Sequence, residues 1–97
     1  MRYEIEFAPE AAQDYRELRV PVRSGVRDAM ETHLRHEPTK TSKSRIKRLR
    51  GILRPQYRLR IGDIRVFYDV TEASVQVLAI VAKTDAHQWL ERWGEKL

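Results

Sequence analysis

Residues 56–68, "QYRLRIGDIRVFY", predict the centre of the fold. Apolar residues alternate with arginines and other polar residues on either side of Gly62–Asp63, a pattern typical of two antiparallel strands joined by a tight turn. Glycine in the first turn position favours a type II′ turn, because that position requires a positive φ. The stretch is therefore predicted to be a β-hairpin.

The turn also determines which residues of the hairpin face each other. With Gly62–Asp63 at the tip, Arg60 lies opposite Arg65 and Arg58 lies opposite Phe67, all on one face. The other face is apolar and is predicted to join the core: Tyr57, Leu59, Ile61, Ile64, Val66 and Tyr68. Like charges directly opposed across two strands cost up to about 1 kcal/mol, so the arginine pair is a local conflict that indicates function.

The arginine face has two interpretations. A guanidinium fork suits phosphate oxygens, and Phe67 beside it suits stacking on an exposed RNA base. The alternative is a solvated sheet face whose arginines lie over apolar neighbours. The opposed arginines favour phosphate binding.

The whole chain, residues 1–97, is predicted to form one α+β domain. A mainly antiparallel sheet carries a helical hairpin on one face, and the last three strands form a meander. The predicted elements are a strand at 2–7, a helix at 9–18, a second helix between Pro21 and Pro38, a loop at 38–50 with a short extended piece at 46–49, the hairpin, a buried strand at 75–82 and a C-terminal helix at 85–93.

The net charge of +5 is concentrated in the middle of the chain. Residues 38–62 hold nine basic and no acidic residues, whereas the segments on either side are each net negative. Such a stretch suggests a polyanionic partner, and the alternative is a solvated basic face or a disordered loop. The predicted RNA-binding side chains of this stretch, beyond the hairpin, are Lys43, Arg45, Lys47, Arg48, Arg50 and Arg54.

Several classes of protein are excluded by composition. Without cysteine there is no disulfide framework or thiolate metal site, and no histidine and carboxylate spacing suggests another metal or a cofactor. The charged start and the lack of a long apolar run predict no membrane association. We therefore expect a soluble cytoplasmic protein.

The motifs "RLRG" at 48–51, "YRLRIGDIRVFYDV" at 57–70 and "VLAIVAK" at 77–83 resemble the RelE/ParE superfamily of bacterial type II toxins. The resemblance implies a RelE/ParE-like, microbial RNase-like fold and a cognate antitoxin as partner. In the RelE branch it implies a ribosome-dependent endoribonuclease that cuts mRNA in the A site. In the ParE branch it implies a DNA gyrase inhibitor without nuclease activity, and a third reading is a catalytically weakened RNA-binding or antitoxin-binding member.

Metal-free RNA cleavage by the 2′-hydroxyl needs a proton acceptor, cations on the phosphorane and an acid for the leaving oxygen. Arg65 matches the arginine that RelE-like enzymes place on the phosphate, and Arg58 and Arg60 match two basic positions on the preceding strand. Arginine stays protonated up to a pH of about 12, so it suits charge stabilisation better than proton transfer. The opposed arginines favour the RelE-like interpretation.

Beyond the last strand the match is partial. Lys83 fits a basic family position, but Thr84 stands where an arginine is expected and Leu90 where a tyrosine is expected. Histidine is the side chain best suited to proton transfer near neutral pH, so His87 is a candidate for the missing acid or base, with an ordinary surface histidine as the alternative. For Trp89, packing onto the sheet is weighed against stacking on a base.

Overall fold

The computed structural model describes all 97 residues as an α+β fold with three α-helices. The sequence prediction of the fold class is confirmed. In chain order the elements are β1 (Glu4–Phe7), α1 (Pro9–Glu17), α2 (Val20–Leu34), β2 (Ile46–Arg48), β3 (Ile52–Arg54), β4 (Tyr57–Ile61), β5 (Ile64–Val70), β6 (Ser74–Ala82), the 3-10 turn η1 (Lys83–Asp85), α3 (Ala86–Trp93) and β7 (Glu95–Lys96).

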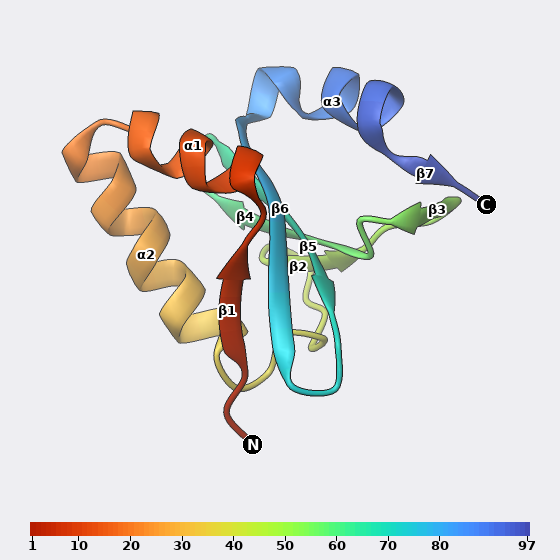
Figure 1. Cartoon of the computed structure of the whole chain (residues 1–97), viewed down its shortest axis with the longest axis horizontal. Coiled ribbons are helices and arrows are strands. Elements are labelled where there is room, and N and C mark those ends of the chain that lie inside the picture. The colour runs from red at the N-terminus through yellow and green to blue at the C-terminus, as the bar shows by residue number, and fades with distance from the viewer.

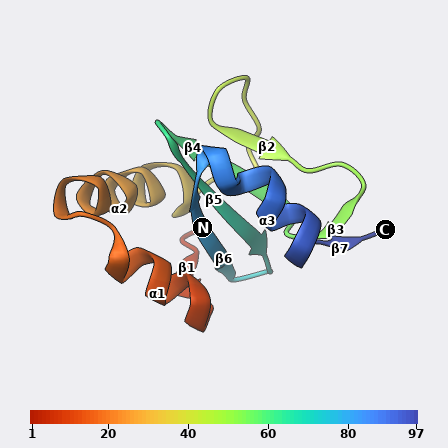
Figure 2. The ribbon, with the colours of Figure 1, turned by 90° about the horizontal axis from the view of Figure 1, so that it is seen from above.

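The main sheet has the strand order β1-β6-β5-β4-β2 (Figure 1). β1 runs parallel to β6, and the other neighbours are antiparallel. Proline in the first turn of α1 and of α2 is tolerated because those N–H groups have no partner within the helix. The two helices cover one face of the sheet, while α3 lies on the opposite side (Figure 2).

The central hairpin has the predicted register. Arg60 pairs with Arg65 and Arg58 with Phe67 across β4 and β5. Gly62 has a φ of 54° and Asp63 has a negative φ, which is the combination that a type II′ turn requires. The alternation therefore separates an apolar face from an arginine face as expected.

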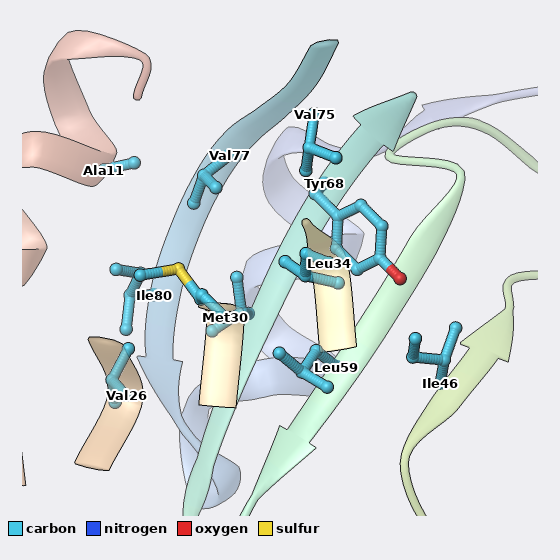
Figure 3. Packing of buried hydrophobic residues seen from close by; sticks show 11 residues of the cluster. Ala11, Val26, Met30, Leu34, Ile46, Leu59, Tyr68, Val75, Val77 and Ile80 are labelled. Atoms are coloured by element: carbon cyan, nitrogen blue, oxygen red, sulfur yellow. The ribbon is translucent and has the colours of Figure 1, made fainter. Parts of the chain in front are cut away.

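The core lies between the apolar hairpin face and α2 (Figure 3). Leu59 and Tyr68 are fully buried and pack beneath Met30 and Leu34 of α2. The Tyr68 hydroxyl donates a 2.7 Å hydrogen bond to the Pro38 carbonyl, which satisfies the one polar atom of this ring. This bond ties the start of the basic loop to the core.

The strand β6 contains a bulge that the apolar run at 75–82 did not reveal. Leu78 is the extra residue, because Tyr68 pairs with Val77 whereas Phe67 pairs with Ala79. Val77 and Ile80 consequently both join the core beneath the helices. The Ile80 N–H donates to the Asp14 carboxylate of α1 at 3.0 Å.

The predicted extended piece at 46–49 is present as β2, which pairs with β4. A second, two-stranded sheet of β3 and β7 was not predicted, because strands this short carry no readable periodicity. It joins the C-terminal tail to the segment before the hairpin. No helix is both long enough and apolar enough to cross a lipid bilayer.

Candidate functional site

The arginine face is built by β4 and β5, which present Arg58, Arg60 and Arg65 on the side of the sheet opposite the core. Arg65 is only 7% exposed, and its Nη1 donates to the Gly62 carbonyl at 2.8 Å and to the Ile64 carbonyl at 3.0 Å. The tight turn therefore holds this guanidinium in place. Arg60 is exposed, and Arg58, which pairs with Phe67, is half-buried.

No carboxylate compensates these three guanidinium groups, because none of them forms an ion pair. The Nε of Arg58 is buried and has no hydrogen-bond partner. Burial lowers the pKa of Arg58, and the charges of Arg65 and Arg60 lower it further. A buried, unpaired donor beside two like charges is unfavourable on its own and is relieved by an anion. The face is therefore a candidate anion site.

Phe67 is fully buried on this face, because Trp89 of α3 stacks on it with ring centroids 5.1 Å apart and an interplanar angle of 8°. Because Trp89 stacks on the Phe67 ring and the ring is fully buried, Phe67 has no exposed face for the predicted stacking on an RNA base. Trp89 packs against the sheet, which is the alternative weighed from the sequence. The tryptophan thus fixes α3 beside the arginines.

Lys83 lies at the same corner as Arg65. Its backbone N–H donates to the Asp63 carbonyl at 2.7 Å, next to the turn that holds the Arg65 guanidinium, and its side chain is exposed. His87 is different: its side chain is 88% exposed, and its Nε2 lies 2.9 Å from Oε1 of Glu91 on the same helix. The structure places the Lys83 backbone beside the turn of the central hairpin and pairs His87 with Glu91 within α3.

The basic stretch outside the hairpin divides into free and occupied side chains. Arg45 Nη1 donates to the Arg60 carbonyl at 3.1 Å, which ties the basic loop to the edge of the arginine face. Arg48 Nη1 donates to the Gln56 carbonyl at 2.9 Å. The remaining exposed cations without ion pairs are Lys43, Lys47 and Arg50. They extend the positive surface along β2 and the adjoining loops.

Arg54 belongs to a structural clamp that sequence analysis missed. Its Nε lies 2.6 Å from Oδ2 of Asp69, and this ion pair raises the pKa of Arg54. The other Asp69 oxygen accepts the Gln56 N–H at 2.8 Å, and the carboxylate is only 8% exposed. Arg54 is therefore not one of the free cations that the predicted RNA surface assumed.

Comparison with known proteins places this arrangement in a family. Residues 5–86 match the family model described as the ParE toxin of type II toxin-antitoxin systems, parDE. No curated protein sequence matches significantly.

Among solved structures, the Mycobacterium tuberculosis RelBE2 complex contains a chain with a TM-score of 0.72 and 23% identity, covering 84% of this chain and 99% of that chain. A chain of the Methanococcus jannaschii RelB-RelE complex has a TM-score of 0.66 and 17% identity, covering 87% and 96%. The Staphylococcus aureus YoeB dimer has a TM-score of 0.64 and 19% identity, covering 81% and 94%. At these identities the neighbours establish the fold.

Proposed function

This chain belongs to the RelE/ParE family of type II toxin-antitoxin toxins, and we propose that it is a metal-independent endoribonuclease that cuts mRNA in the ribosomal A site. The observation that carries the proposal is the arginine face, where three guanidinium groups converge without a carboxylate and one buried Nε has no partner. A protein that only docked onto another protein would have less need of converged, uncompensated phosphate ligands.

In the proposed reaction the ribose 2′-hydroxyl attacks the adjacent phosphate and leaves a 2′,3′-cyclic phosphate. Negative charge develops on the phosphorane oxygens, and preorganised cations lower its free energy most effectively. Arg65 is preorganised by its bonds to the turn carbonyls. The half-buried Arg58 adds positive charge beside the phosphate, and the exposed Arg60 reaches the flanking phosphate.

Proton transfer is assigned to groups next to the arginines, because arginine itself does not release its proton at neutral pH. Lys83, whose backbone N–H donates to the Asp63 carbonyl beside the turn, protonates the 5′ leaving oxygen in this proposal. His87 is the candidate acceptor for the proton that the 2′-hydroxyl loses, and it must first leave Glu91.

The proposed partners follow from the same surface. Programmed ribosomes present mRNA in the cytoplasm, and the basic loop beside the arginines suits the phosphate-rich surroundings of the A site. A cognate antitoxin with an acidic or amphipathic segment would cover the arginine face and block access to RNA. The solved complexes of similar fold are themselves toxin-antitoxin pairs, which supports an antitoxin partner.

The test is to add the purified protein to ribosomes carrying a defined mRNA and to map new 5′ ends by primer extension. Cleavage at the A-site codon should require the ribosome and should be lost in Arg60→Ala, an exposed position that leaves the turn intact. Arg92→Ala, an exposed arginine on α3, is the matched control and should cut normally. Absence of any cut by the wild type, with the fold verified by circular dichroism, would refute the nuclease.

Inhibition of DNA gyrase is the second candidate function, and two observations favour it. The family model that matches this chain is described as the ParE toxin. In addition, Thr84 and Leu90 stand where RelE-like nucleases are expected to have an arginine and a tyrosine. A supercoiling assay distinguishes the two functions. Under this alternative the protein inhibits gyrase, Arg65→Lys retains the inhibition, and no mRNA is cut.

A further inference from the structure

A second surface lies between α1, α3 and the β3–β7 sheet, next to the arginine face, because Val81 of its lining pairs with Arg65 and Trp89 stacks on Phe67. It is a cavity of about 470 Å³, large enough for several side chains of a bound peptide. Its apolar lining comes from Pro55 and from Leu78 and Val81 of β6, and its aromatic wall from Trp89 and Trp93 of α3. None of the three hairpin arginines lines it. We call this cavity the aromatic groove.

The aromatic groove carries negative charge, although the protein as a whole is basic. Glu10, Asp14 and Glu95 lie on its lining. The one cation there, Arg54, is already neutralised by Asp69 at 2.6 Å. Arg54 also interacts with Glu95. The lining still holds three carboxylates against this one guanidinium, so its net charge is negative and disfavours phosphates.

Trp93 shows how the groove receives a cation. Its side chain is 60% exposed, which is unusual for an indole. The guanidinium carbon of the neighbouring Arg92 lies 5.1 Å from the indole ring centroid, so this ring already attracts a guanidinium. Indole faces combined with carboxylates are suited to a cation on an apolar stem.

We infer that the aromatic groove docks a basic, apolar segment of a partner polypeptide. An arginine or lysine of the partner lies against Trp93 and between Glu10 and Glu95, and an apolar neighbour of that residue packs on Leu78 and Val81. Charge complementarity and the exposed indole carry this assignment. It does not depend on the nuclease proposal, because its contacts use none of the three hairpin arginines.

A second copy of this chain is the competing occupant of the groove. The longest acid-free basic segment is 38–62, and a shorter one spans 18–27. The cations of the longer segment on β2 lie at the edge of the sheet opposite β1 (Figure 2), whereas its Arg54 already lines the groove. Unless two copies exchange segments about a two-fold axis, inserting a segment of one copy into the groove of another makes a head-to-tail contact, which leads to open chains. Self-association is therefore an outcome that contradicts the inference.

The test is an NMR titration of the two indole N–H signals, using a short amidated peptide of alternating leucine and arginine. We expect saturable shifts of the Trp89 and Trp93 signals and none with the matched leucine and glutamate peptide. Glu10→Gln and Glu95→Gln should each weaken binding by about two- to fivefold, as loss of one exposed ion pair predicts. Trp93→Ala should weaken binding at least as much.

The controls separate docking from general charge attraction. Glu17→Gln removes an exposed carboxylate of the same helix, α1, that does not line the groove, and it should bind the peptide as the wild type does. Equal weakening in Glu17→Gln, unshifted indole signals, or indole shifts that depend on protein concentration without peptide would each overturn the inference. Amide spectra of every variant verify the fold.

Discussion

Replacing Arg58 with methionine should stabilise the protein. The Arg58 Nε is buried without a partner, and burial together with Arg65 and Arg60 lowers the pKa of its guanidinium. An unsatisfied buried donor costs about 1–3 kcal/mol, and the lower end applies because the side chain is only half-buried. Methionine keeps the aliphatic packing of the arginine stem without the charge. We therefore expect a gain in the free energy of unfolding of about 1 kcal/mol.

For a domain of this size, 1 kcal/mol raises Tm by about 4–8 °C, which thermal denaturation followed by circular dichroism resolves. Arg48→Met is the matched control, since Arg48 is exposed, donates to the Gln56 carbonyl and lies over the Tyr57 ring at 5.1 Å. Arg48→Met should be neutral or slightly destabilising. If Arg58→Met does not raise Tm above that of Arg48→Met, the buried Arg58 guanidinium does not destabilise the folded protein. The argument that this guanidinium is relieved by binding an anion then fails.

The remaining predictions concern the clamp, the C-terminal strand and alkaline stability. Asp69→Ala should lower the free energy of unfolding by about 3 kcal/mol in urea denaturation, because it removes two hydrogen bonds to a nearly buried carboxylate. In a protein that already carries Arg54→Ala, the same substitution should cost less, because one of the two hydrogen bonds is already absent. In Gly94→Ala the new Cβ would lie 2.5 Å from the Leu90 carbonyl oxygen, so amide exchange in β3 and β7 should accelerate while the main sheet stays protected. Burial raises the pKa of Tyr68, so the unfolded chain releases this proton first and the free energy of unfolding should fall as pH rises above about 10; Tyr68→Phe should lack that part of the fall in a pH series.

The hairpin could be predicted from the sequence because its determinants are local. The alternation of side chains assigns each residue to a face, and a glycine in the first turn position fixes the register. The observed pairs, from Tyr57 with Tyr68 to Ile61 with Ile64, agree with that register. The same reasoning placed the three arginines together.

The residues that cover the arginine face could not be predicted from the local sequence. Phe67 was assigned to the correct face, but the ring that buries it, Trp89, is on a helix that follows another strand. The sequence likewise predicts Arg54 as a free RNA-binding cation, because its ion-pair partner, Asp69, lies 15 residues further along the chain on β5. The bulge at Leu78 escaped prediction because an apolar run has the same appearance with or without one extra residue. In each case a contact between distant segments decides the outcome.

The central claim is that the hairpin arginines bind RNA phosphates, and the salt dependence of binding tests it most directly. The ligand is a single-stranded RNA with 2′-O-methyl groups, which binds but has no free 2′-hydroxyl for cleavage. The logarithm of affinity should fall with the logarithm of salt by about 0.7 per phosphate contacted. Arg60→Ala should reduce that slope by about 0.7, and the Arg92→Ala control should leave it unchanged. An Arg60→Ala slope equal to that of the wild type would contradict the account.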